Sequence, residues 1–229
     1  MEYRELGRTG VNVSALTLGT MTFGEQNTEA EGHAQMDYAV DSGINIFDAA
    51  EIYPIPPKPE TQGRTEEVIG TWLATRKNRD KVLVATKVAG RSTTIDWLRH
   101  KPATLSRQSP AQILEAVDKS LARLKTDYID LYQLHWPDRP MRIFEGLEYV
   151  RLPGDAHPIH DILSTLGKLV ADGKVRFIGL SNETPWGVMT YLRLAEQHGL
   201  PRRPRSRTPS TSSTGHSRWV CRRFSIRSR

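Results

Sequence analysis

Four side chains that can take part in acid–base chemistry stand at the ends of short apolar segments or just beyond one. Asp48 ends "INIFD", Lys87 ends "KVLVATK", His135 ends "YIDLYQLH", and Tyr53 follows Asp48 within a few residues. A free tyrosine has a pKa of about 10 and is a poor acid at neutral pH. A lysine ammonium within about 4 Å would favour the phenolate by about 4 kcal/mol at an effective dielectric near 20, or about three pKa units. We therefore expect Lys87 to make Tyr53 a stronger acid.

Together these residues could reduce a carbonyl group. Asp48 would keep Lys87 charged and oriented, and Tyr53 would protonate the carbonyl oxygen as hydride reaches its carbon. A neutral His135 could orient the carbonyl through a hydrogen bond. Each residue also has a purely structural explanation when it is taken alone: a cap, an exposed lysine, a packed loop aromatic and a structural histidine. Four different reactive types at four equivalent positions favour the catalytic interpretation.

Alternating strand and helix patterns would bring these positions together. Strands are predicted at 16–20, 44–48, 81–87, 128–135 and 175–182, and the helices that follow them at 29–42, 65–76, 109–126, 160–173 and 185–199. This repetition indicates an α/β fold with a parallel sheet and right-handed crossovers, either doubly wound or an eight-stranded barrel. A small hairpin is expected before the first strand. The polar segments 91–108 and 136–155 are expected to be loops over the carboxyl ends of the strands, where a barrel carries its active site.

The composition restricts the class of protein. The single cysteine, Cys221, has no partner for an intrachain disulfide, and no apolar run is long enough to span a bilayer. The first residues lack the order of a signal peptide, so a cytoplasmic protein without membrane partners is expected. Of the 32 Lys and Arg residues, nine lie in 202–229, which leaves 23 against 26 acidic residues elsewhere. The net charge of +6 therefore comes from this segment, and it gives no reason to expect nucleic-acid binding.

At these residues the sequence resembles the aldo-keto reductases. The family's tetrad of Asp, Tyr, Lys and His falls on Asp48, Tyr53, Lys87 and His135, inside "FDAAEIY", "ATKV" and "LYQLHWPD". The resemblance covers residues 1 to about 201. It implies a (β/α)8 TIM barrel that binds NADPH without a Rossmann fold, so the absence of a GxGxxG motif is expected. It also implies reduction of aldehydes or ketones to alcohols, a small-molecule carbonyl substrate, and no metal.

The same resemblance implies the residues that contact the cofactor NADP(H). They are Gly19, Thr20, Met21, Asp48, Ser181 and Asn182. Ser181 and Asn182, in "IGLSNE", would hold the amide of the nicotinamide, and the segment around Thr20 would approach the cofactor from the first barrel strand. From the residues alone, Ser181 and Asn182 could also be a helix N-cap.

The sequence departs from the family after Pro201. A family member should continue with a sixth strand and two further βα units, whereas residues 202–229 have no strand or helix pattern. Synonymous codons can be chosen for 205–229 so that a shifted reading frame encodes IQNPFNLLNRSFEVGLPEVFDPEQ, the continuation that a family member should have. We therefore expect a partial barrel of about five βα units in 1–201 and an out-of-frame, disordered tail in 202–229. A natural disordered basic tail is the alternative.

Other functions stay open. A barrel of this kind could be a regulatory or binding subunit, like the potassium-channel β-subunits that share the fold, because fold alone does not decide function. The chain could also be an inactive fragment, since about five of eight strands cannot close a barrel and would leave two open edges. Negligible reductase activity is therefore expected of these 229 residues alone. A nucleic-acid-binding tail would need basic and aromatic side chains interleaved on an ordered face, and Trp219 and Phe224 supply little of this.

Overall fold

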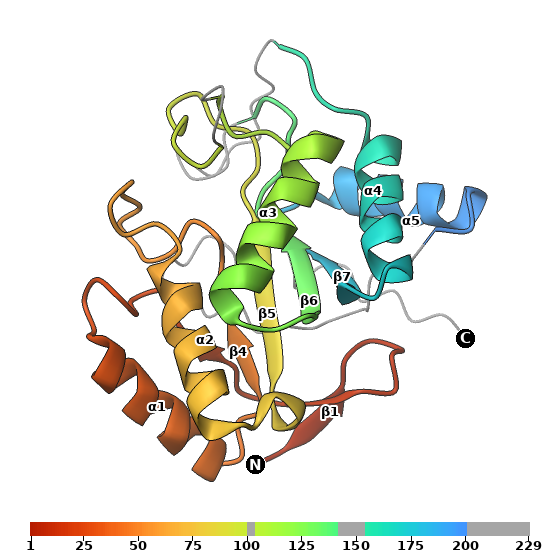
Figure 1. Ribbon diagram of the computed structural model, residues 1–229. Helices are drawn as coiled ribbons and strands as arrows, with labels where there is room; N and C mark the ends of the chain where they lie inside the picture. Colours follow the sequence, from red (N-terminus) through yellow and green to blue (C-terminus); the bar gives the residue numbers. More distant parts are fainter. Residues whose placement is uncertain (100–103, 142–153, 201–229) are drawn as a thin grey trace.

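The computed structural model describes residues 1–99, 104–141 and 154–200 of the chain (Figure 1). The strands are β1 (Tyr3–Glu5), β2 (Asn12–Ser14), β3 (Leu18–Gly19), β4 (Ile46–Asp48), β5 (Leu83–Val88), β6 (Ile129–Leu134) and β7 (Val175–Leu180). The helices are α1 (Glu29–Asp41), α2 (Arg64–Arg76), the short 3-10 helix η1 (Arg79–Lys81), α3 (Pro110–Leu124), α4 (Ile159–Ala171) and α5 (Pro185–Gln197). Every strand and helix expected from the sequence is present, and the predicted tail at 202–229 lies outside the described residues.

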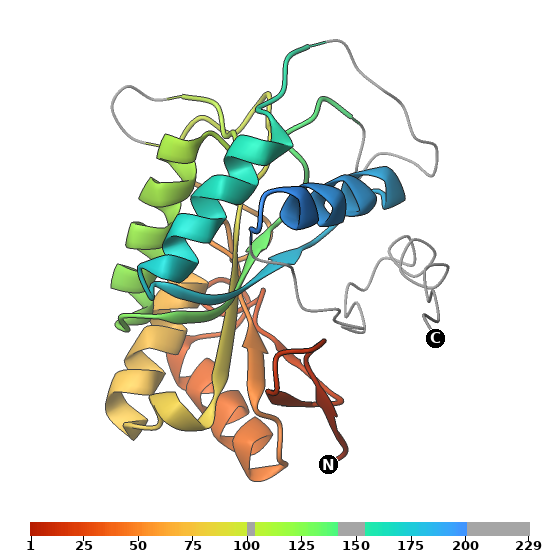
Figure 2. The same cartoon turned by 90° about the vertical axis from the view of Figure 1, so that its right-hand side faces the viewer.

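The parallel sheet has the order β3-β4-β5-β6-β7, which is also the order along the chain. A doubly wound sheet reverses its strand order at a switch point and carries helices on both faces. Neither feature occurs among the described strands, and α1 to α4 lie along one side of the sheet (Figure 2). The sheet is therefore part of a barrel wall, which confirms the predicted fold class. Within the described residues, β3 and β7 each have a neighbour on one side only.

The second predicted strand is shorter than expected, because its first residues have other partners. Asn45 exchanges hydrogen bonds with Ser14 of the N-terminal hairpin: its Oδ1 accepts from the Ser14 amide at 2.8 Å and its amide donates to Ser14 Oγ at 3.1 Å. The amide of Ile44 donates to the carbonyl oxygen of Ala39 in α1 at 2.8 Å. Pairing in the sheet therefore starts at Ile46, and the hairpin is fastened to the amino end of β4.

Helix starts and stops follow the local sequence. Ser109 caps α3 by accepting from the amide of Gln112, and Pro110 takes the first helical position, where no amide hydrogen is needed. Gly43 follows α1 with φ of +83°, a conformation that costs little without a Cβ atom. These signals act over a few residues, so the sequence pattern was sufficient to predict them.

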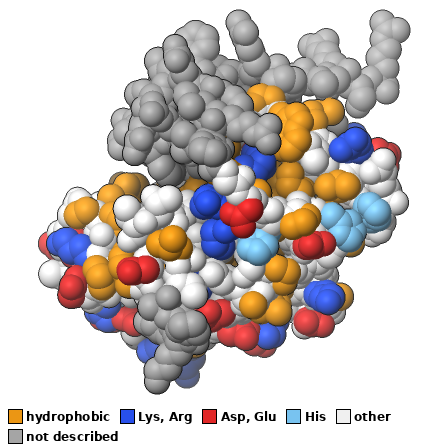
Figure 3. Space-filling model, turned by 90° about the horizontal axis from the view of Figure 1, so that it is seen from above, with side chains coloured by type: hydrophobic (Ala, Val, Ile, Leu, Met, Phe, Trp, Pro, Cys, Tyr) orange, Lys and Arg blue, Asp and Glu red, His pale blue; other side chains and the backbone are white. Residues whose placement is uncertain are grey.

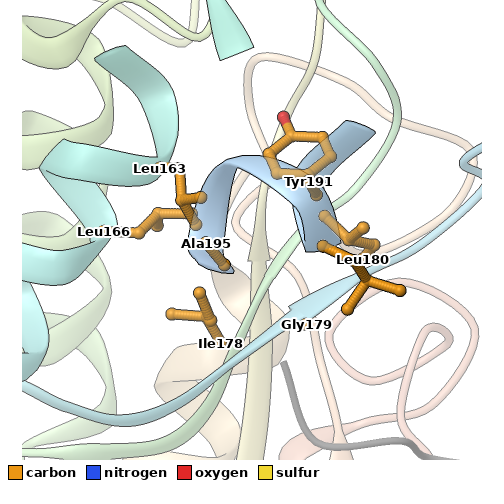
Figure 4. A pocket seen from close by; sticks show the side chains of 8 residues that line it. Leu163, Leu166, Ile178, Gly179, Leu180, Tyr191 and Ala195 are labelled. Carbon is orange, nitrogen blue, oxygen red and sulfur yellow. The ribbon is translucent and has the colours of Figure 1, made fainter. Parts of the chain in front are cut away.

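The core lies between the sheet and its helices. Phe47 of β4 meets Trp72 of α2 edge to face, with ring centroids 5.4 Å apart. The last βα unit is equally tight: the cavity between α4, β7 and α5 has a volume of only about 10 Å³ (Figure 4). A cavity needs roughly 10–15 Å³ to hold a single water molecule. The contact of β7 with α4 and α5 is therefore packed and offers no room for a ligand.

Gly70 allows α2 and α3 to approach closely, and we expect Gly70→Ala to destabilise the fold by about 1–3 kcal/mol. A Cβ atom at Gly70 would lie 2.1 Å from the carbonyl oxygen of Arg123 and 2.8 Å from the carbonyl carbon of Leu124, both backbone atoms that cannot rotate away. The free energy of unfolding, measured in urea, checks this. Gly173→Ala is the control, since it adds a Cβ in open space at a positive φ and should cost only about 1 kcal/mol. Equal losses in the two variants would contradict the close packing.

Candidate active site

An ion pair between Asp48 and Lys87 lies at the carboxyl ends of β4 and β5. Lys87 Nζ donates to Asp48 Oδ2 at 2.7 Å and to the carbonyl oxygen of Ala49 at 2.6 Å. Lys87 is only 4% exposed, so the interpretation as an exposed strand-end lysine is wrong. Burial lowers the pKa of Lys87, but the attraction of Asp48 and Tyr53 outweighs this and raises it above its ordinary value. The geometry agrees with the expectation that Asp48 keeps Lys87 charged and oriented.

Tyr53 lies beside this pair but is a weaker acid than expected. Lys87 Nζ is 4.9 Å from the centroid of the Tyr53 ring, which meets the ring of His135 edge to face at 5.5 Å. Burial raises the pKa of Tyr53 above its ordinary value; Lys87 opposes this rise and Asp48 adds to it. Lys87 lowers the pKa of Tyr53, as predicted, but the net result is not the stronger acid that was expected, because burial and then the charge of Asp48 outweigh the effect of Lys87. The phenol keeps its proton at neutral pH, as a proton donor must.

His135 joins the cluster directly after β6. Its ring contacts the Tyr53 ring and, with centroids 4.9 Å apart, the ring of Trp136. Burial, and then the charge of Lys87, lower the pKa of His135 well below its ordinary value. His135 is therefore neutral at pH 7, as expected. Its Nδ1 atom is buried and has no hydrogen-bond partner within the described part of the chain.

Because His135 resists protonation in the folded state, we expect the fold to lose stability as the pH falls below about 6.5. In that range the unfolded chain binds a proton at His135 that the folded chain does not, which costs at most about 1.4 kcal/mol per pH unit. Urea unfolding at pH 7.5 and 5.5 measures the loss, and His135→Asn should reduce it. His160→Asn, which changes a half-exposed histidine on α4, should leave the loss as it is in the parent chain. An identical pH dependence in the His135→Asn variant would contradict the neutral state of His135.

The segment after β3 reaches the same strand ends. Thr20 is fully buried, and its Oγ1 and amide both donate to the carbonyl oxygen of Asp48, at 2.8 and 3.1 Å. Gly19 lies opposite Asp48 in the register of β3 and β4. The carbonyl oxygen of Met21 accepts from the amide of Ile55 at 2.9 Å, which joins this segment to the loop that carries Tyr53. The structure thus places Gly19, Thr20 and Met21 next to the cluster, and their role as cofactor contacts stays a prediction.

Ser181 and Asn182 follow β7 on the other side of the cluster. The side-chain amide of Asn182 donates to the carbonyl oxygen of His135 at 2.9 Å and to Ser181 Oγ at 3.2 Å. The residue that caps α5 is Thr184, so the interpretation of Ser181 and Asn182 as the helix N-cap is wrong. The structure brings both residues to the strand ends, as the cofactor prediction requires, and their contact with a cofactor stays a prediction.

Two features of the site were missed by sequence reasoning. Gln133 Nε2 donates to Asp48 Oδ1 at 3.2 Å, so each oxygen of this carboxylate has a donor. Glu51 forms a bidentate ion pair with Arg99, whose two Nη atoms donate to Glu51 Oε1 and Oε2 at 2.7 and 2.8 Å. Neither residue is more than 2% exposed. The available signals were a carboxylate inside the apolar run "FDAAEIY" and an amide inside the apolar strand "LYQLH".

Ion pairs and hydrogen bonds connect the loops at the carboxyl end of the sheet. Asp138 accepts from Nε and an Nη atom of Arg107, both at 2.9 Å, and from the backbone amides of Gln108 and His157 at 2.9 and 2.8 Å. Seen from this end, basic and acidic side chains lie next to one another near the middle of the visible face (Figure 3). The described parts of the two long polar segments are loops here, as expected, and their middles lie outside the described residues.

The size of hollows does not locate the site. A hollow of about 450 Å³ lies beside β3 and α1, away from the catalytic candidates. It is lined by Leu18, Ala34, Gln35, Tyr38, Ala39, Ser42 and Ile44. In the three described ranges no group of at least three His, Cys, Asp or Glu residues is suited to a metal ion. None of the helices in those ranges has the length and apolarity that crossing a bilayer requires.

Comparison with known proteins agrees with this geometry. The model of the family described as "Aldo/keto reductase family" matches residues 15–201. Protein tas of Escherichia coli (strain K12) is 50% identical over 205 residues, which are 88% of this chain and 58% of that protein. The uncharacterized oxidoreductase YrpG of Bacillus subtilis (strain 168) is 38% identical over 198 residues, 86% of this chain and 54% of that protein. A crystal structure of a thermostable aldo-keto reductase in complex with the inhibitor epalrestat matches with a TM-score of 0.65 and 25% identity, over 89% of this chain and 61% of that chain. The chain thus spans about half the length of the curated relatives it matches.

Proposed function

The chain belongs to the aldo/keto reductase family, and from this premise we propose that its site serves the NADPH-dependent reduction of aldehydes or ketones to alcohols. The observation that carries the proposal is the 2.7 Å contact of Lys87 with Asp48, with Tyr53 and His135 beside it. All four residues come from the carboxyl ends of adjacent parallel strands, the end at which barrels carry their active sites. Because the chain spans 58% of Protein tas, the activity is proposed for the closed barrel to which these residues would contribute.

The residues at the ends of β3 and β7 suit the amide group of a nicotinamide. Such an amide needs an acceptor for its NH₂ group and a donor for its carbonyl oxygen, and the side-chain oxygen of Asn182 and the hydroxyl of Ser181 have these properties. Gly19 is exposed at the edge of the sheet and lets a flat ring approach the backbone. A nicotinamide cofactor bound there would supply the hydride. The preference for NADP(H) over NAD(H) rests on the family resemblance alone.

Within this proposal each side chain has one task. Tyr53, which is protonated at neutral pH, donates its proton to the carbonyl oxygen of the substrate. Lys87, held by Asp48, places a positive charge beside the phenol and stabilises the negative charge that develops there as the proton leaves. Neutral His135 donates a hydrogen bond to the same carbonyl oxygen and orients it toward the hydride donor.

The test is NADPH consumption with a panel of aldehydes and ketones, checked by measuring the alcohol that forms. Two forms are compared: the 229-residue chain and a form in which the reading frame is restored after residue 204. We expect the restored form to produce one molecule of alcohol for each molecule of NADPH consumed, and the 229-residue chain to produce little alcohol. A restored form that binds NADPH but reduces no member of the panel would contradict the reductase and favour a binding subunit. A restored form that does not bind NADPH would favour an inactive fragment.

We also propose that residues 202–229 are read out of frame. All basic residues of this segment other than His216 are arginine, and a shifted frame can encode a family-like continuation in place of a patternless one. Sequencing the gene across codons 198–230 checks this. The expected result is an alternative frame that encodes the family-like continuation and stays open past codon 229, whereas stop codons in that frame would show a genuine basic tail. The cytoplasmic location stays a prediction from the sequence.

A further inference from the structure

Gln133 contacts the catalytic ion pair from the next strand of the sheet. Its Nε2 atom donates to Asp48 Oδ1 at 3.2 Å, while Lys87 Nζ donates to Asp48 Oδ2 at 2.7 Å. A carboxylate can only accept hydrogen bonds, so Gln133 must present its NH₂ group and not its oxygen to Asp48. The plane of the carboxylate is therefore held by two donors that come from two different strands.

The register of the sheet explains how Gln133 reaches Asp48. Gln133 of β6 lies opposite Lys87 of β5 on one side and opposite Gly179 of β7 on the other. Its side chain crosses β5 to reach Asp48 in β4. Gly179 makes room for it: a Cβ atom at Gly179 would lie 2.9 Å from Gln133 Cγ and 3.2 Å from Leu131 Cδ1. The missing side chain at Gly179 and the extended side chain of Gln133 are thus complementary.

We propose that Gln133 is a positioning residue of the reductase site. By holding Asp48 Oδ1, it prevents the carboxylate from rotating, and it thereby keeps the Lys87 ammonium aimed at Tyr53. The ammonium also donates to the carbonyl oxygen of Ala49, which would draw it away from the ring of Tyr53 if the carboxylate turned. This inference rests on the proposed function, because aiming Lys87 matters only if Tyr53 donates a proton.

The first test is Gln133→Met, which keeps the length of the side chain and removes its amide. In whichever of the two forms carries the activity, we expect kcat to fall about tenfold. This is less than the roughly 10²-fold that a 1 Å misplacement of a catalytic group can cost. The KM for NADPH should stay within about twofold. Tyr132→Phe is the control: it lies on the same strand, faces the helices, and loses a buried hydroxyl that has no hydrogen-bond partner in the described part of the chain. An unchanged kcat in Gln133→Met, or a change confined to the KM for NADPH, would overturn the proposal.

Gly179→Ala tests the same contact without removing the amide. The added methyl group should push Gln133 off Asp48 and lower kcat as well. Because both substitutions act through one contact, the double variant should lose no more activity than Gln133→Met alone. Additive losses would show that Gln133 and Gly179 act independently, and would count against the proposed positioning.

A measurement without turnover separates this inference from the proposed function. The ¹⁵N NMR signal of the Lys87 ammonium, assigned by its loss in Lys87→Met, reports how well that ammonium is ordered in the 229-residue chain. We expect the signal to broaden or shift in Gln133→Met and Gly179→Ala, and to stay unchanged in Tyr132→Phe. If the chain reduces no carbonyl, the proposed function fails, yet this spectrum still decides whether Gln133 orders Lys87. An unchanged Lys87 signal in both variants would refute the positioning role.

Discussion

Replacing Tyr53 by phenylalanine is expected to lower the rate of carbonyl reduction by about 10²- to 10⁴-fold, the range typical for the loss of a general acid. The change removes one oxygen atom and leaves the ring, with its contacts to His135 and Lys87, in place. Binding of NADPH should therefore stay within about twofold of the parent protein. Steady-state turnover with the carbonyl panel and a fluorescence titration with NADPH measure the two effects, in whichever of the two forms carries the activity.

The control for this substitution is Tyr38→Phe. Tyr38 is 75% exposed on α1 and is not part of the cluster, so the rate should not change. Circular dichroism of the Tyr53→Phe protein should match that of the parent, which separates lost chemistry from lost structure. A Tyr53→Phe protein with the turnover of the parent would refute the assignment of Tyr53 as the proton donor.

Arg99→Met is expected to destabilise the fold by about 3–5 kcal/mol, because it leaves the buried carboxylate of Glu51 without its partner. Glu51 is 1% exposed, and after the change it would still accept from the amide of Ala89, a neutral donor at 2.7 Å from its Oε1. The ion pair joins the segment between β4 and Tyr53 to the loop that follows β5, so the loss should also loosen the site. The midpoint and slope of urea unfolding provide the measurement.

Two controls test the reason for this loss. Lys174→Met breaks the ion pair with Asp118, in which the side chains are 41% and 60% exposed, and should cost no more than about 1 kcal/mol. The double variant Glu51→Gln, Arg99→Met removes both charges and keeps an acceptor for the Ala89 amide. It should be more stable than Arg99→Met alone. A double variant as unstable as Arg99→Met would show that packing, and not the unpaired charge, explains the loss.

The elements and the catalytic candidates could be predicted because short-range patterns determine them. Asp48 and Lys87 lie at the ends of apolar strands, His135 directly follows one, and parallel strands in a barrel bring such ends to one face. The start of α3 was visible in Ser109 and Pro110, and the end of α1 in Gly43. Each of these signals involves neighbouring residues only. The structure contains every helix end and strand end that they predict.

What could not be predicted depends on contacts between distant residues. Glu51 and Arg99 are 48 positions apart, and Gln133 and Asp48 are 85 positions apart, so no local pattern connects them. The pKa of Tyr53 was mispredicted for the same reason. The charge of Lys87 was counted from the sequence, but the burial that raises this pKa arises only when loops and strands pack together.

The most direct test of the central claim, that the cluster around Tyr53 reduces a carbonyl group, is to follow a deuterium label from the cofactor to the product. NADPH carrying deuterium at C4 of the nicotinamide, in each of its two stereoisomers, is incubated with the protein and an aldehyde, and the alcohol is analysed by mass spectrometry. We predict one deuterium on the carbinol carbon from one of the two isomers, and a rate of transfer lower by about 10²- to 10⁴-fold in Tyr53→Phe. Alcohol without label from either isomer, or transfer that is equally fast in Tyr53→Phe, would contradict this account.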